Sequence, residues 1–332
     1  MPGGLLVGDI ISKRPSLANV ILCAANPEET PFITRIRKGK KLRQFDHKYF
    51  VEKVPARKTG GATDGQDVTS FGKGRKRYEV SIRAQEFRRT YKVGQQSQEI
   101  VEDEAVPDQM AKLRLEEGKE IMKDVESKAL SDDVSAADTG NEDEGSRMAG
   151  LGYMLTAPGV AMTDNSFHDD IRIPANQRFT GTYASFVETS LTDLMENRRT
   201  LCGASAELVA LIGTQIQRKF DNFENYVPDL AGHSAVLRNM QNTSLKREIR
   251  RGIRYYEGSF GTVELIIADY NPKARRGYLL DFEQTEWLPM GAGAEKKVLP
   301  DLGGGPRELL KFTGAWKPGD CRAHILIKPS DE

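Results

Sequence analysis

Apolar and polar residues alternate in two stretches of the N-terminal third of the chain. The first stretch begins at Lys41, and the second covers residues 77 to 84. Alternation of this kind is typical of a β-strand with one face against a core. The glycine-rich residues 55 to 74 lie between the stretches and predict a loop. We therefore expect a long hairpin over residues 41–93, with these residues on its apolar faces: Phe45, His47, Tyr49 and Val51, then Tyr78, Val80, Ile82 and Ala84.

Residues 1–40 show no clear periodicity, and four prolines interrupt them. Proline removes a backbone donor and breaks helices, so we expect an extended N-terminal arm. A two-stranded hairpin is only marginally stable in isolation. Nothing in the next segment looks like a core of its own for the hairpin, so we expect it to lie on another copy of the chain.

A long polar helix is predicted over residues 106–131. Asp103 and Glu104 precede it and Pro107 lies near its first turn, as expected for a helix N-terminus. Its apolar stripe is narrow, and it carries favourably spaced charge pairs. At about 1.5 Å per residue the helix is roughly 35 Å long. The acidic residues that follow, 131–150, predict a mobile loop. The charge pairs on the predicted helix are Glu116 with Lys119, Glu120 with Lys123, and Asp124 with Lys128.

The C-terminal half predicts an α+β fold with a compact core. A second amphipathic helix fits residues 182–199, followed by a strand at 207–213 and a short helix. Strands then dominate to the end of the chain, separated by turns with Gly and Pro. The strand-like runs are GTVELIIAD, GYLLDFE, TEWLPM and CRAHILIK.

The composition is that of a soluble globular protein. The 332 residues are 38% hydrophobic and 29% charged, with no apolar run long enough for a membrane helix and no signal-peptide pattern. Export is not expected. Cys23, Cys202 and Cys321 are far apart and odd in number, so we interpret them as reduced thiols in the core, which suits a reducing cytoplasm.

The charges are unevenly distributed although their sum is zero. Residues 1 to 100 contain 20 Lys and Arg against 10 Asp and Glu, whereas residues 101 to 200 contain 10 against 21. Opposite charge in two segments of one chain indicates that the basic arm of one copy meets an acidic face of another. Zero net charge argues against a general nucleic-acid binder.

Common catalytic and cofactor motifs are absent from the sequence. It has no phosphate-binding loop, no Cys-x-x-Cys pair, and neither a zinc-protease nor a serine-hydrolase motif. The one cluster of metal-ligand types, residues 168–170, is interpreted as a solvated turn, and Gly303 to Gly305 as a flexible turn. We expect no catalytic residue, no cofactor and no metal.

Two alternatives remain open at this stage. The basic hairpin, including Lys76, has the charge to grip DNA phosphates as the β-arms of architectural proteins do. Such proteins are usually basic overall, which this chain is not. An enzyme of unrecognised type within residues 182–332 has no positive support.

Several strings resemble the major head proteins of tailed bacteriophages. They are EFRRTYKVGQQSQEIV before the long helix, GLGYML after the acidic loop, and YYEGSFGTVELIIADY before the GYLLDFE strand. The order of arm, hairpin, long helix and α+β region is similar to the Hong Kong phage (HK97-like) capsid fold. The resemblance implies an N-terminal arm at 1–40, an E-loop at 41–93, a peripheral domain at 94–181 with its spine helix, an axial domain at 182–290, and a return to the peripheral domain at 291–332.

The same resemblance implies a structural function. The subunit would form hexamers and pentamers that close into an icosahedral head, assembled in the host cytoplasm and located in the virion. Implied partners are further copies of the chain, a portal and in some cases scaffolding or decoration proteins, with packaged DNA contacted non-specifically and no membrane. Some family members crosslink a Lys to an Asn of a neighbour, for which the candidates are Lys58, Lys73, Asn239 and Asn242.

The hairpin supplies the residues that we expect to contact a neighbouring subunit. Apolar side chains would provide affinity, and charged side chains would provide register and partner choice. The expected contacts are Phe45, Tyr49, Arg57, Lys58, Lys73, Arg75, Arg77, Tyr78, Val80 and Ile82.

Overall fold

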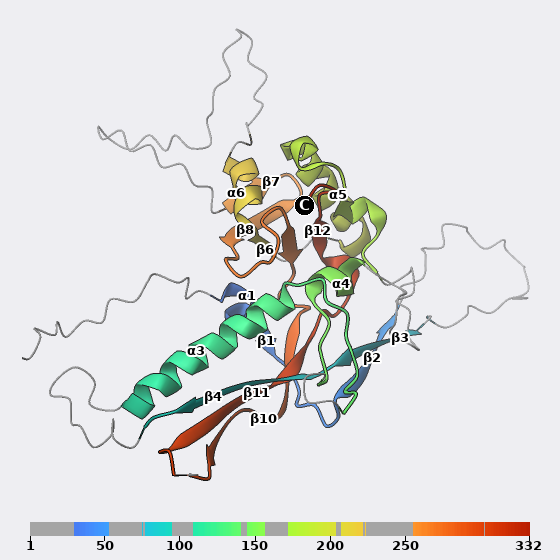
Figure 1. Ribbon diagram of the computed structural model, residues 1–332. Helices are drawn as coiled ribbons and strands as arrows, with labels where there is room; N and C mark the ends of the chain where they lie inside the picture. Colours follow the sequence, from blue (N-terminus) through green and yellow to red (C-terminus); the bar gives the residue numbers. More distant parts are fainter. Residues whose placement is uncertain are drawn as a thin grey trace, which may run out of the picture.

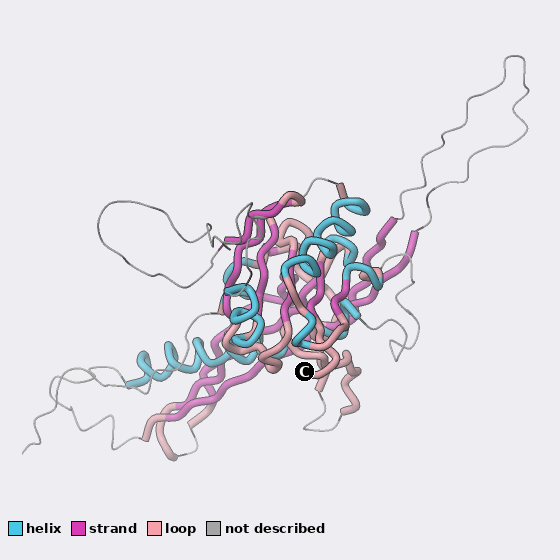
Figure 2. The backbone as a smooth tube through the Cα atoms, turned by 90° about the horizontal axis from the view of Figure 1, so that it is seen from above, coloured by secondary structure: helices cyan, strands magenta, loops and turns pink. Residues whose placement is uncertain are grey.

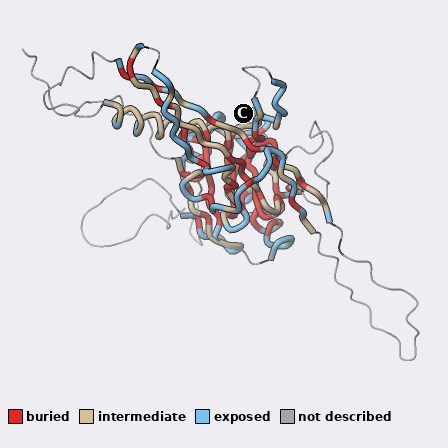
Figure 3. The backbone as a smooth tube through the Cα atoms, turned by 90° about the horizontal axis from the view of Figure 1, so that it is seen from below, coloured by how far each residue is buried: buried red, intermediate tan, exposed pale blue. Residues whose placement is uncertain are grey.

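The computed structural model describes ten stretches of the chain, and within them the strands form two larger sheets and a separate hairpin (Figure 1). The described residues are 30–52, 75, 77–94, 109–140, 145–156, 172–203, 207–221, 223, 255–301 and 303–332. Buried residues gather in the centre of the molecule, whereas the projecting ends are more exposed (Figure 3).

The first sheet has four strands in the described residues and carries the long helix on one side (Figure 1). Its order is β1 (Arg37–Lys38), β10 (Glu286–Leu299), β11 (Arg307–Lys317) and β4 (Gln85–Lys92). The β10–β11 pair and the β11–β4 pair are antiparallel. Helix α3 (Gln109–Ala129) lies along β4 and β11, which confirms the helix predicted over 106–131. Its apolar stripe buries Ile121, Val125 and Ala129.

The second sheet has six strands in the described residues; one of its faces lines a second core, and the other faces the core that contains the four-stranded sheet. All five residues of its central strand β6 are buried, as expected for a strand covered on both faces. Helices α5 (Glu188–Cys202) and α6 (Thr214–Asp221) pack against this sheet through Leu191 and Phe220. The strand order is β5 (Arg178–Phe179), β12 (Ile325–Ile327), β9 (Gly277–Leu280), β6 (Leu208–Ile212), β8 (Gly261–Ile267) and β7 (Tyr255–Gly258).

Strands β2 (Asp46–Glu52) and β3 (Arg77–Arg83) pair antiparallel and form the predicted hairpin. They project at the opposite end of the molecule from the start of α3 (Figure 2). The hairpin is shorter than predicted, because the chain after β3 continues as β4 and joins the four-stranded sheet. The expected hairpin over 41–93 is therefore wrong at its C-terminal end. Alternation of apolar and polar residues predicts a strand, but it does not reveal which partner that strand pairs with.

The end of the predicted N-terminal arm is folded into the core. Residues Pro31–Arg35 form the short helix α1, with Pro at the helix start, where its missing N–H costs nothing. Phe32 is fully buried and its ring packs edge-on against Trp316. An extended arm to residue 40 is thus wrong for residues 31–35. Residues 1–29 lie outside the described residues.

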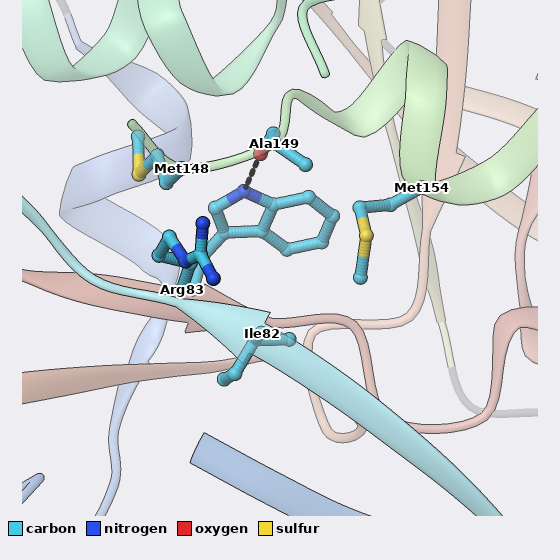
Figure 4. A pocket seen from close by; sticks show the side chains of 6 residues that line it. Ile82, Arg83, Met148, Ala149 and Met154 are labelled. Carbon is cyan, nitrogen blue, oxygen red and sulfur yellow. Dashed lines mark hydrogen bonds between the residues drawn. The ribbon is translucent and has the colours of Figure 1, made fainter. Parts of the chain in front are cut away.

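The predicted loop at 131–150 is fixed at both ends rather than mobile throughout. Ala136 and Arg147 form a β-bridge, and Met148 is buried in the core beneath the hairpin. Met148 and Ala149 meet Ile82 around the Trp316 indole, whose Nε1 donates to the Ala149 carbonyl at 2.7 Å (Figure 4). The acidic composition hides these anchors, because only a few apolar residues are needed to fix a loop. Helix α4 (Leu151–Thr156) follows.

The last strands of the C-terminal half are divided between the two sheets. Strand β10 begins at Glu286 and joins the four-stranded sheet, whereas β12 pairs with β9 in the six-stranded sheet. The chain therefore crosses between the sheets twice after β9. Strand patterns predict strands and not the sheet that each one joins, which is set by contacts distant in sequence.

The second predicted helix begins later than expected. Helix α5 starts at Glu188, while residues 183–185 form the short 3-10 turn η3 (Tyr183–Ser185). Cys202 ends α5 and is exposed, so its predicted place in the core is wrong, whereas Cys321 is buried as predicted. The other short turns are η2 (Ala175–Gln177) and η4 (Cys321–Ala323).

A buried carboxylate joins α1 to α3. The Glu126 side chain is fully buried, and it accepts hydrogen bonds from the backbone N–H groups of Phe32 at 3.0 Å and Ile33 at 2.9 Å. These N–H groups belong to the first turn of α1 and have no partner within the helix. Burial raises the pKa of Glu126 to about 7, and the two backbone N–H donors limit the rise.

We expect Glu126→Gln to remove a pH dependence of stability. The folded protein holds this proton more tightly than the unfolded chain, whose glutamates titrate near 4.5. The resulting stabilisation is complete below about pH 4.5 and is lost as pH rises to about 7, an effect of up to about 3 kcal/mol. Urea unfolding of both proteins from pH 4.5 to 8 measures it. A constant difference in stability across that range would contradict the prediction.

We expect Gly319→Ala to destabilise the protein more than Gly303→Ala. Both glycines have positive φ, +69° and +84°, so alanine at either site costs about 1 to 2 kcal/mol of backbone strain. Only at Gly319 would the new Cβ also collide with the backbone carbonyl of Gln284, because Gly303 faces open space. The free energy of unfolding should therefore fall by at least about 1 kcal/mol more for Gly319→Ala. Equal losses in denaturant unfolding would show that this collision relaxes without cost.

Candidate inter-subunit surface

The outer face of the hairpin carries a row of cross-strand ion pairs. Arg83 bonds Asp46 at 2.5 Å and Arg77 bonds Glu52 at 2.6 Å, each directly across the two strands. Lys48 bonds Glu79 diagonally at 2.6 Å. Charged pairs opposite one another stabilise an antiparallel pair modestly and keep its register. The described basic residues of β2 and β3 are therefore paired with acids of the same hairpin.

Phe50 interrupts this charged face. It lies opposite Glu79 in the register, between the two outer ion pairs, and 66% of its side chain is exposed. An exposed phenylalanine among paired charges is the usual composition of an interface anchor with a polar rim. The sequence contained a signal for it, because Phe50 is an apolar residue at a position of the alternation where its neighbours are polar.

The inner face of the hairpin is committed to the chain's own core. Tyr49, Val80 and Ile82 are buried there, and Tyr78 packs against the same core while remaining half-buried. The Tyr49 hydroxyl donates to the Gly319 carbonyl at 3.1 Å. The three buried residues thus pack inside the single chain, and the expectation that they contact a neighbour stays a prediction. The hairpin does have a core of its own, built from segments far away in the sequence.

Two of the remaining expected contact residues lie in the described part of the chain. Phe45 is 42% exposed and lies just before β2. Arg75 is exposed and lies 3.8 Å from Glu52. Several other candidates lie outside the described residues: Arg57, Lys58, Lys73, Lys76, the crosslinking candidates Asn239 and Asn242, and the cluster at 168–170.

Part of the charge asymmetry is neutralised within the chain. Arg89 of β4 meets Asp124 of α3 through two hydrogen bonds of 2.9 Å, so a basic N-terminal residue pairs with the acidic segment that follows it. On α3 itself Lys123 bonds Glu120 at 2.7 Å as predicted, whereas Lys128 turns to Asp133.

A second charged cluster lies where α3 meets β11. Glu308 is buried. Its carboxylate accepts two hydrogen bonds from Arg114, both 3.0 Å, and a third from the Tyr91 hydroxyl. Lys296 lies 3.4 Å from the same carboxylate. These donors keep the pKa of Glu308 below its ordinary value although burial acts in the opposite direction. The cluster fixes α3 on the sheet.

Other large apolar side chains are exposed on both parts of the molecule. Leu115 on α3 and Val298 on β10 lie on the part with the four-stranded sheet, whereas Val187, Leu201, Tyr255 and Ile267 lie on or beside the six-stranded sheet. The exposed apolar residues besides those of the hairpin are Leu115, Val134, Val187, Leu201, Tyr255, Ile267 and Val298.

Sites for small ligands are poorly developed in the described residues. The pocket in Figure 4, beside Met154 and Trp316, holds no more than about one water molecule. The three N–H groups of Gly303 to Gly305 donate to the Asp301 carboxylate, which confirms the predicted turn and occupies the donors that a phosphate would need. Within the described part, no acidic, His or Cys cluster can hold a metal ion, and no helix is long and apolar enough to cross a membrane.

The fold is similar to that of several solved capsid structures. The capsid of cyanophage P-SCSP1u matches with a TM-score of 0.61 and 10% identity, over 99% of this chain and 96% of that chain. The capsid of cyanophage A-1(L) matches with 0.60 and 13%, over 95% and 96%. The capsid of a native GTA particle matches with 0.58 and 14%, over 98% and 97%. At these identities the likeness establishes the fold, which is the HK97-like capsid fold.

The sequence comparison narrows the class of capsid folds to one family. A family model described as SU10 major capsid protein matches residues 7–304. The chain belongs to the SU10 major capsid protein family. No curated protein sequence matches it.

Membership defines the chain as a structural, non-enzymatic protein that builds a phage capsid by self-association and is located in the virion. The two alternatives, a DNA-binding architectural protein and an unrecognised enzyme, gain no support. The paired charges of the described strands β2 and β3 agree with this outcome, because basic residues that already hold carboxylates are poor phosphate ligands.

Proposed function

We propose that the chain assembles into hexamers and pentamers that close into an icosahedral head around packaged DNA, in the host cytoplasm. In this proposal the four-stranded sheet with α3 is the peripheral domain, the six-stranded sheet is the axial domain, and β2–β3 is the base of the E-loop. A portal occupies one vertex, scaffolding or decoration proteins act where present, and DNA is contacted without sequence preference.

The outer face of the hairpin forms the contact between neighbouring subunits. The observation that carries this assignment is the exposed Phe50, which lies on the only face of the described hairpin that the chain's own core leaves free. Exposed ion pairs contribute about 0 to 1 kcal/mol each, so the flanking pairs provide register and the aromatic ring provides affinity. Repetition over many copies turns a modest contact into a stable shell.

We expect Phe50→Thr to abolish shell assembly and to leave the single chain folded. Threonine keeps the preference for strand and removes the aromatic ring, and aromatic anchors contribute about 2 kcal/mol or more to an interface. Because Phe50 is exposed, the free energy of unfolding should change by less than about 0.5 kcal/mol. Negative-stain microscopy and light scattering measure assembly, and circular dichroism measures folding.

Phe50→Leu is the matched control, because it keeps an apolar side chain at the same position and should assemble. Tyr78→Asp is a less selective test, since Tyr78 packs on the chain's own core and its loss disturbs folding as well. Normal shells from Phe50→Thr would show that the outer face of the hairpin does not form the contact between subunits. A folded wild-type chain that never forms rings or shells would count against the assembly proposal itself.

A further inference from the structure

Two crossovers connect the six-stranded sheet to the four-stranded sheet, and they lie side by side. Residues 281–285 lead from β9 to β10, and residues 318–324 lead back from β11 to β12. Gly319, with φ of +69°, lies directly against the backbone of Gln284. The two segments therefore form a direct backbone link between the sheets, beside the apolar core that both sheets share.

The imidazole of His324 joins the crossovers. It is fully buried, its Nδ1 accepts from the backbone N–H of Asp281 at 3.1 Å, and its Nε2 lies 2.8 Å from the Pro318 carbonyl. Only one tautomer satisfies both contacts. Because Nδ1 accepts and a carbonyl cannot donate, the proton must be on Nε2 and donated to Pro318. The neutral ring is therefore required by its two partners.

Arg198 of α5 reinforces the same junction. Its Nε donates to the Ala323 carbonyl at 2.5 Å, and its guanidinium bonds the Asp281 carboxylate at 3.2 Å. Arg198 and Asp281 are both buried, so the pair connects the two crossovers inside the protein. Arginine keeps its charge over the whole physiological range, so this link is permanent, whereas the imidazole link depends on a single proton.

We propose that His324 is a pH-sensitive lock between the two sheets: its neutral ring holds the crossovers together, and protonation of the ring releases Asp281 so that the sheets can change their relative orientation. An imidazolium has donors at both nitrogens, so its Nδ1–H would face the Asp281 N–H instead of accepting from it. The lock acts within a single chain and goes beyond the proposed assembly.

The surroundings of the ring determine the direction of the pH effect. Burial lowers the pKa of His324, Arg198 acts in the same direction, and Pro318, Asp281 and Asp320 oppose them. The folded chain thus binds this proton less readily than the unfolded chain, whose histidines titrate near 6.5. The stabilisation is complete above about pH 6.5 and is lost as pH falls, by a factor of about ten in the opening equilibrium per pH unit. This sign is opposite to that of Glu126.

Hydrogen exchange of the unassembled full-length chain from pH 7.5 to 5 tests the lock, after correction for intrinsic exchange rates. We expect protection of peptides covering 281–285 and 318–324 to fall by up to about tenfold per pH unit below about 6.5, while β6 keeps its protection. Protection that stays constant at the crossovers, or falls equally in β6, would overturn the proposal. This measurement needs no variant and does not depend on shell formation.

His324→Asn and His324→Gln sharpen the test, because neither side chain titrates. Asparagine keeps an acceptor near the position of Nδ1, and glutamine keeps a donor near that of Nε2, so both variants should lose the pH response at the crossovers. His47→Gln is the control, since His47 lies on β2 and should leave the response unchanged. A wild-type response in a folded His324 variant, or its loss in His47→Gln, would contradict the lock.

Discussion

The burial of one face of each long element against a common core is the constraint on which the structure depends. Phe32 of α1, Val125 of α3, Val80 of the hairpin and Trp316 of β11 meet in this core, although they are far apart in sequence. Once the inner face of β2 and β3 is used in this way, the outer face of these two described strands remains for other molecules. The proposed subunit contact lies on that outer face because the chain's own core uses the inner one.

Many charged side chains, like the apolar ones, find their partners within the chain. Pairs such as Arg89 with Asp124 and Arg83 with Asp46 neutralise charges within the chain, and the net charge of the whole is zero. Exposed pairs contribute little stability each, but they remove free charges that would attract nucleic acid or repel another copy. A shell subunit benefits from such a surface, because many identical copies must approach one another closely.

The junction between the sheets combines tight backbone contact with buried polar groups. Gly319 allows the crossovers to touch, and Arg198, Asp281 and His324 satisfy one another where water is excluded. Buried polar groups specify a geometry when all their hydrogen bonds are made and destabilise it when one is lost. These buried polar groups add a directional link between two sheets that also share an apolar core.

The sequence by itself determined the elements with strong periodicity and the family. Alternation predicted β2 and β3, charge and apolar spacing predicted α3, and several strings along the chain resemble those of tailed-phage head proteins. These features are local, since a period of two or of 3.6 residues is set by the backbone of one segment. The absence of catalytic motifs agreed with a structural protein.

Only the tertiary structure decided the partners of those elements. It showed that β4 leaves the hairpin, that β12 returns to the six-stranded sheet, and that Tyr49 faces the chain's own core. It also revealed the pairing of His324 with Asp281 and the exposure of Phe50. Each outcome depends on contacts between segments distant in sequence, and local propensity and patterning do not encode which distant surface a face will meet.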